Sequence, residues 1–170
     1  MGLKENYTGT EWQKREEYYR DSLMKLSIPE LPTSREVLKL TSALDTLMTE
    51  ATFDCANIER KYERATLELK NAEAELFNIL KQQKLLEGAK VTEADVKGLV
   101  KTYLKDNPIG GFQKDIYTIL KVTMDRLTYA KAIVKAISEK KGAIISALSI
   151  LKLEATVSPA TKDVNLENIA

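Results

Sequence analysis

Few residues in this chain carry reactive side chains, because it has no histidine and a single cysteine, Cys55. Without histidine there is no Ser-His-Asp or Cys-His arrangement, no Cys/His zinc site, and no Glu-x-x-His pair of the kind that builds a di-iron centre in a helical bundle. The sequence also lacks a GxxxxGK(S/T) phosphate loop and a GxGxxG turn. We therefore expect a protein that is not an enzyme and that has no metal site and no cofactor.

The remaining groups that could do acid–base or nucleophilic chemistry are carboxylate pairs and the one thiol. Glu16 with Glu17, and Glu73 with Glu75, stand among lysines in segments of helical periodicity, so we interpret them as solvated surface charges. Cys55 falls on an apolar helix seam, which favours a structural thiol over a nucleophile. A lone cysteine excludes an internal disulfide and fits a reducing compartment.

Lysines offer a different chemistry, because they can neutralise phosphates. The net charge of +1 hides an uneven distribution: residues 34–88 carry eight basic and ten acidic side chains, whereas residues 112–153 carry eight basic and three acidic ones. In the second segment the lysines recur at helical spacing. Such a strip either follows a phosphate backbone or is simply a solvated helix face. Its members are Lys131, Lys135, Lys140 and Lys141.

A long helix must position many of these side chains, since residues 34–87 contain neither glycine nor proline. A helix of this length would extend about 80 Å at 1.5 Å per residue. Apolar residues recur at alternating spacings of three and four from Val37 to Ile79, except for two successive fours around Ala51. This stutter either unwinds a coiled-coil seam locally or marks a bend between Ala51 and Asp54.

Three further helices are predicted. A short amphipathic helix covers about 10–26, and the prolines of the following SIPELPTS connector cannot continue it. Thr33 and Glu36 then form a capping box for the long helix, and Gly88 ends that helix. Thr92 and Asp95 begin another short helix, which stops at Asn107-Pro108. After a hinge at Gly110 and Gly111, a second long helix runs from about 112 to 153.

The apolar stripe of the second long helix is wider than one antiparallel partner would cover. The N-terminal helix, the short helix or a copy of the same chain could bury the remainder, and the elongated shape favours a copy. We therefore expect an all-α fold, an elongated and oligomeric hairpin of two long helices with a short connecting helix and an N-terminal helix. The predicted divisions are 1–33 (N-terminal helix and Pro-containing connector), 34–155 (helical hairpin) and 156–170 (flexible tail). The residues predicted to join chains are Ile116, Ile119, Ile133, Val134, Ile137, Ile144 and Leu148.

No stretch approaches the roughly 18 uncharged apolar residues of a membrane span, and the MGLKENY start lacks an apolar signal core. We expect no membrane association and a location in the cytoplasm.

Three stretches together resemble a known family: LFNILKQQKLLEGAK, VTEADVKGLVKTYLKDN and LTYAKAIVKAISEKKGAIISALSILKLEA, within about residues 44–155. Their arrangement is similar to that of the UvsY-type recombination mediators of T-even-like bacteriophages. The resemblance implies a homo-oligomeric ring that binds single-stranded DNA and loads a recombinase onto strands coated by a single-strand-binding protein, in the host cytoplasm. It assigns DNA contact to Lys81, Lys84 and Lys90, and residues 1–40 have no counterpart in it.

Two other classes of function fit the same pattern. In a structural or assembly protein of a phage virion, the coils would join subunits without touching DNA. A helical adaptor would present one face to a partner protein, with Trp12, Tyr18 and Tyr19 as aromatic anchors. Salt-dependent binding of single strands separates the mediator from both.

Overall fold

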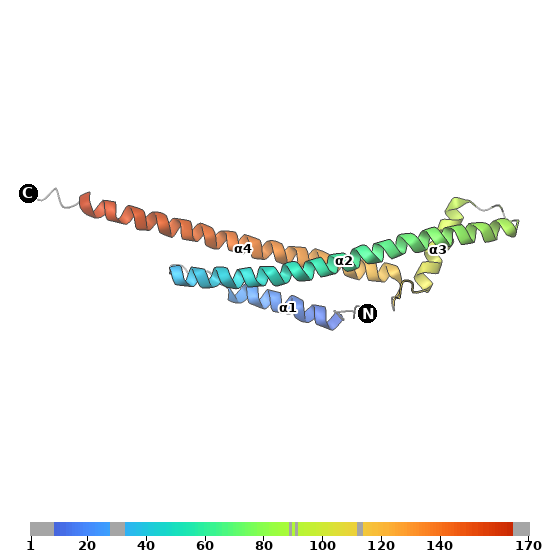
Figure 1. The fold of residues 1–170 in the computed structure, drawn as a ribbon, viewed down its shortest axis with the longest axis horizontal. Coiled ribbons are helices and arrows are strands. Elements are labelled where there is room, and N and C mark those ends of the chain that lie inside the picture. Colours follow the sequence, from blue (N-terminus) through green and yellow to red (C-terminus); the bar gives the residue numbers. More distant parts are fainter. Residues whose placement is uncertain (1–8, 28–32, 89, 91, 112–113, 165–170) are drawn as a thin grey trace, which may run out of the picture. The chain divides into compact units, whose positions relative to one another are not determined.

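The computed structural model describes the backbone of residues 9–27, 33–88, 90, 92–111 and 114–164, and their side chains except those of 9, 10, 151 and 154–164. These residues form four helices and no strand, which confirms the all-α prediction. The helices are α1 (Gly9–Lys25), α2 (Ser34–Leu86), α3 (Glu93–Asp106) and α4 (Ile116–Val164) (Figure 1). No described helix holds an apolar stretch long enough to span a membrane.

Local side-chain hydrogen bonds explain where α2 begins and ends. The Thr33 backbone N–H donates to Glu36 Oε2 at 2.8 Å, and the Glu36 N–H donates to Thr33 Oγ1 at 3.3 Å, so the predicted capping box is present. At the other end Gly88 has a φ of 69°, in the left-handed region, and its N–H donates to the Leu85 carbonyl. Only glycine adopts that conformation without strain, and this ends the helix.

The caps of α3 and α4 follow the same logic. Thr92 accepts from the Asp95 N–H, and the Asp95 carboxylate accepts from the Thr92 N–H, which confirms the predicted start of α3. For α4, Asp115 accepts a 2.8 Å hydrogen bond from the Thr118 N–H. The helix therefore begins at Ile116, a few residues later than expected from periodicity, and it continues past 155 to Val164. Of the predicted tail, residues 156–164 belong to this helix and 165–170 lie outside the described residues.

The chain divides into two units, one of residues 1–52 with 132–170 and the other of residues 53–131. In the first unit, α1 and the two long helices each contribute to one apolar core (Figure 1). Burying each large aliphatic side chain contributes about 1.5–3 kcal/mol, so this seam holds the three segments together. Its buried members are Tyr19, Val37, Leu44, Leu47, Ala51, Ile133, Ile137 and Ile144.

The second unit packs α3 against the later part of α2 and the start of α4. The apolar residues of α3 recur every four positions, so they share one face and enter one core. Contacts between α2 and α4 in this unit run in opposite chain directions, since Glu59 meets Lys131 while Glu73 meets Tyr117. The buried core residues are Ala65, Val96, Val100, Leu104 and Ile116.

The stutter coincides with the boundary between the units. Helix α2 is continuous through Ala51 and Asp54, and the division falls between Thr52 and Phe53. A stutter shifts the phase of the apolar seam without requiring the hydrogen-bonded helix to break. The change of phase is therefore accommodated inside an unbroken helix.

Candidate nucleic-acid interface

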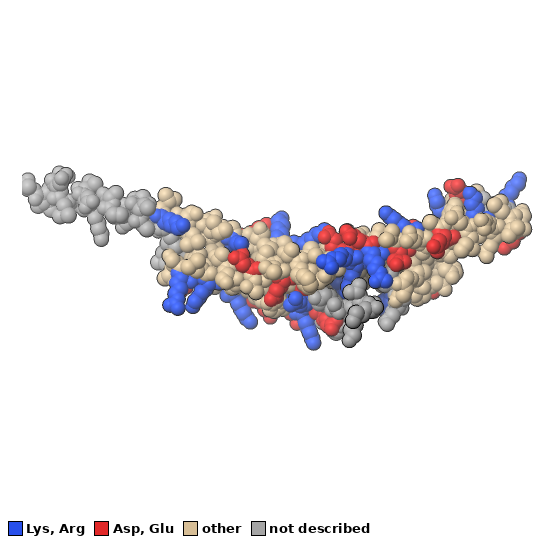
Figure 2. Space-filling model, in the orientation of Figure 1, with Lys and Arg blue, Asp and Glu red and all other residues tan. Residues whose placement is uncertain are grey.

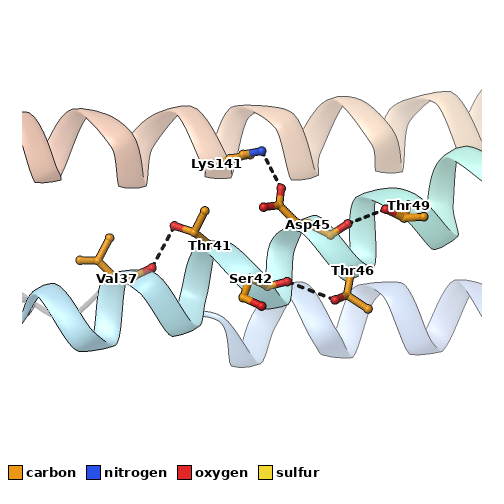
Figure 3. Close-up of polar contacts among 7 residues, drawn as sticks. All are labelled: Val37, Thr41, Ser42, Asp45, Thr46, Thr49 and Lys141. Carbon is orange, nitrogen blue, oxygen red and sulfur yellow. Dashed lines mark hydrogen bonds and ion pairs between the residues drawn. The ribbon is translucent and has the colours of Figure 1, made fainter.

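The lysines predicted to form a positive strip on α4 are engaged within the chain. Lys131 Nζ donates to Glu59 Oε1 at 3.0 Å, and Lys141 Nζ donates to Asp45 Oδ1 at 2.5 Å (Figure 3). Both carboxylates belong to α2, so α2 supplies the counter-charges for this part of α4. A phosphate approaching either lysine would have to displace a carboxylate already in place.

The other two lysines of this α4 strip also have partners. Lys135 lies 3.7 Å from Glu139, one helical turn away. Lys140 Nζ donates to the backbone carbonyl of Leu23, in the last turn of α1. Carbonyls at a helix C-terminus lack intrahelical donors, so this ammonium group caps α1 and binds it to α4. Three of the four strip lysines therefore connect α4 to α1 or α2, and Lys135 pairs within α4.

The pKa of Lys131 reports the same engagement. Its hydrogen bond to Glu59, and then the charge of that carboxylate, raise the pKa of the ammonium group above its ordinary value. Cys55 lies close by, and its pKa is raised chiefly by burial and then by the charge of Glu59. A raised pKa keeps the thiol protonated at neutral pH, which is unfavourable for a nucleophile.

The lysines near the end of α2 are more open. Lys81 is exposed, with its ammonium group 5.8 Å from the centre of the Phe77 ring, and Lys90 is exposed after the helix ends. Lys84 forms a 2.8 Å ion pair with Glu87, a partner in the same final turn. Among the described residues, Lys81 and Lys90 have no carboxylate within ion-pair distance.

Helix α3 carries three lysines that the sequence analysis did not single out: Lys97, Lys101 and Lys105. All three are exposed, and within the described part of the chain none forms an ion pair. A spacing of four residues places them along one side of the helix. Their four-residue spacing is the sequence signal for this row, whereas net charge alone favours the second long helix.

Acidic and basic side chains are interspersed on the face of the molecule shown in Figure 2. A carboxylate beside a lysine cancels much of the electrostatic potential of that lysine, however many basic residues its helix contains. Unpaired lysines, rather than the most basic segment, are therefore the better guide to a phosphate-binding surface.

The aromatic residues proposed as anchors for a protein partner divide into two groups. Trp12 and Tyr19 are 3% and 1% exposed, and Tyr19 is part of the first unit's core. Tyr18 is exposed beside Arg15, whose guanidinium carbon lies 5.7 Å from the ring centre. Two of the three candidate anchors are thus occupied in holding α1 in place.

The residues predicted to join chains are largely used inside one chain. Those that are buried in the two cores have no surface to offer a second copy in this conformation; they are Ile116, Ile133, Ile137 and Ile144. Ile119, Val134 and Leu148 are partly buried against the same cores and stay predicted contacts. The apolar side chains that α4 leaves exposed are different ones, including Met124, Ile145, Ile150 and Leu153.

A shallow depression of about 450 Å³ lies along one face of α2 in the first unit. Its threonine hydroxyl groups donate back to the helix's own carbonyls, as Thr41 does to Val37 at 2.9 Å and Thr49 to Asp45 at 2.9 Å (Figure 3). Asp45 is held by Lys141. The depression therefore presents few free polar groups to a ligand.

Within the described residues, no three carboxylate or cysteine side chains converge as a metal site would require. No protein-family model matches the chain, and neither curated proteins nor solved structures include a match to it.

Proposed function

We propose that this chain is a non-enzymatic protein that binds single-stranded DNA as a recombination mediator. In this role it would load a phage recombinase onto strands coated by a single-strand-binding protein, as the resemblance over residues 44–155 implies. The observation that carries the proposal is the exposure of Lys81 and Lys90, without carboxylate partners among the described residues, at positions that the resemblance assigns to DNA.

The engagement of the α4 strip changes how DNA binding is distributed. Lys131 and Lys141 already neutralise carboxylates of α2, so their net contribution to phosphate binding is small. Lys81 and Lys90 release condensed counterions when they meet phosphates, and that release supplies most non-specific affinity. Binding should therefore be nearly independent of sequence and should weaken with salt.

Self-association completes the proposal. The exposed apolar residues of α4, among them Ile145 and Ile150, supply a surface on which copies of the chain can pack. In an oligomer the weak phosphate contacts of each protomer act together on one strand, which raises the overall affinity by avidity.

Fluorescence anisotropy with labelled oligothymidine tests the proposal. Affinity should fall on the order of tenfold or more between low and physiological salt. Replacing Lys81 and Lys90 with alanine should weaken binding, whereas replacing Lys131 and Lys141 should weaken it less, with helicity and sedimentation unchanged in both. If the unaltered protein binds no single strands even at low salt, the mediator proposal fails and a virion assembly protein becomes the better explanation.

A further inference from the structure

Three lysines of α3 form a regular row, here named the α3 lysine ladder: Lys97, Lys101 and Lys105. Successive members are separated by about 6 Å along the helix axis, so the row extends about 12 Å. On another face of the same helix, the buried side chains of Val96, Val100 and Leu104 anchor α3 in the second unit's core. The ladder therefore stands on a helix whose orientation within its unit is held by packing.

After its first turn, α3 carries its basic and acidic side chains on different sides. At 100° per residue, the three lysines fall within an arc of roughly 80° beside the buried face. Glu93, in the first turn, stands four residues before Lys97 and begins the same row. The carboxylates of Asp95 and Asp106 project from other directions, and Asp95 is committed to the cap at Thr92. The flank that carries the ladder is therefore basic over most of the helix.

The ladder also differs from the α4 strip in its contacts. Each lysine of that strip has an acceptor within the chain, whereas the three ladder lysines form no ion pair or printed hydrogen bond with any described residue. An exposed ammonium group without a protein counter-charge can neutralise a phosphate and release the cations condensed on the nucleic acid, with a gain in entropy. Unpaired lysines on a rigid helix thus fit a partner with regularly spaced negative charges.

We propose that the α3 lysine ladder is a phosphate-binding edge for single-stranded DNA, contacting on the order of three phosphates of the backbone. This inference rests on the proposed function and adds to it a surface beyond Lys81, Lys84 and Lys90. The exposed aromatic ring of α3, Tyr103, lies by helical geometry on the opposite flank from the ladder, so stacking does not accompany these contacts. Recognition at this edge is of the backbone and not of the bases.

The test compares two triple variants of the full chain by anisotropy with labelled oligothymidine over a salt series. The ladder variant carries Lys97→Gln, Lys101→Gln and Lys105→Gln. The control variant carries Lys14→Gln, Lys25→Gln and Lys39→Gln, which removes three exposed lysines of the first unit and the same net charge. Glutamine keeps a helix propensity close to that of lysine, so both variants should retain their circular dichroism.

The ladder variant should lose affinity at low salt on the order of tenfold or more, and the slope of log K against log salt should fall by about 2, or about 0.7 for each phosphate. The control variant should leave the slope unchanged. If the ladder variant keeps the slope of the unaltered protein, or matches the control, the ladder inference is wrong and the proposed function stands. If the unaltered protein does not bind oligothymidine, both fail together.

Two further measurements keep the result decisive. Should the ladder variant unfold, Lys101→Gln alone should lower the slope by about 0.7, and an unchanged slope would overturn the inference. Competition with polyglutamate at the same ionic strength distinguishes DNA from an acidic protein. Equal competition by polyglutamate and oligothymidine would contradict a phosphate-binding edge and identify a surface for an acidic polypeptide.

Discussion

Lysines on α3 and on α4 have the same chemistry, yet the structure gives them different surroundings. On α4, Lys131 and Lys141 meet carboxylates of α2, and Lys140 caps the carbonyl end of α1. On α3, the ladder lysines stand exposed without an acceptor among the described residues. The difference teaches that the lysines of a basic segment stay available to an outside phosphate only where the neighbouring helices do not supply their counter-charges.

The largest effect is expected from a substitution that disrupts the packing of α4 against α1 and α2, because the contacts of the α4 lysines depend on that packing. Ile137 is 0% exposed in the first core, so Ile137→Glu would bury a charge and should cost about 4 kcal/mol or more. Urea denaturation followed by circular dichroism measures the loss. The same change at Ile145, which is 51% exposed on the same helix, should cost far less.

The Ile145 variant also tests self-association. If copies pack through the exposed apolar residues of α4, Ile145→Glu should lower the mass measured by sedimentation while helicity is retained. If Ile137→Glu and Ile145→Glu lower the free energy of unfolding equally, α4 is not divided into a buried and an exposed face.

A cap mutation should weaken α3 without touching its lysines. Thr92→Ala removes the hydroxyl that accepts from the Asp95 N–H, keeps the backbone N–H that donates to the Asp95 carboxylate, and should cost about 1 kcal/mol. Thr102→Ala is the matched control, because that hydroxyl donates only to the Gly98 carbonyl within α3 and alanine is the better helix former. Hydrogen exchange of the α3 amides should accelerate in the first variant and not in the second. Equal exchange in the two would show that Thr92 does not set the start of α3.

Pairing of Lys141 with Asp45 should be measurable but small. A double-mutant cycle with Lys141→Ala and Asp45→Ala should give a coupling of about 0.5 kcal/mol that decreases as salt is added. Lys101→Ala, on the ladder, should leave the free energy of unfolding nearly unchanged, with little dependence on salt. If the free-energy changes of the two single substitutions simply add at low salt, Lys141 and Asp45 do not interact, and the distinction between paired and unpaired lysines fails.

The smallest expected effect is a decrease in the stability of α3 at low pH. Hydrogen bonds from the Thr92 side chain and backbone lower the pKa of Asp95 below its ordinary value of 3.8. The contribution of this carboxylate is therefore complete above 3.8 and is lost as the pH falls through the lowered pKa. Unfolding midpoints measured at decreasing pH should fall in the parent, and Asp95→Asn should remove that part of the dependence. An identical acid profile in the variant would count against the cap.

The helices of this protein were predictable because their signals are local. Each capping box, at Thr33 and at Thr92, joins residues three positions apart, and a single glycine at 88 ends α2. Signals this short can be recognised in the sequence. The start of α4 was placed too early because periodicity was used there in place of the cap. Asp115, three residues before Thr118, was the local signal that marks it.

What each side chain does within those helices was decided by tertiary structure. Sequence periodicity identified Ile137 and Ile144 as members of an apolar stripe, but it did not say whether that stripe faces α2 of the same chain or another copy. Charge counts likewise favoured α4 over α3 as a phosphate-binding segment. The acceptors of Lys131 and Lys141 lie 72 and 96 residues away in the chain, and only the packing of α2 against α4 brings them together. Burial in the cores and the ion pairs of Lys131 and Lys141 depend on neighbours distant in sequence, whereas helix formation and capping depend on neighbours within one turn.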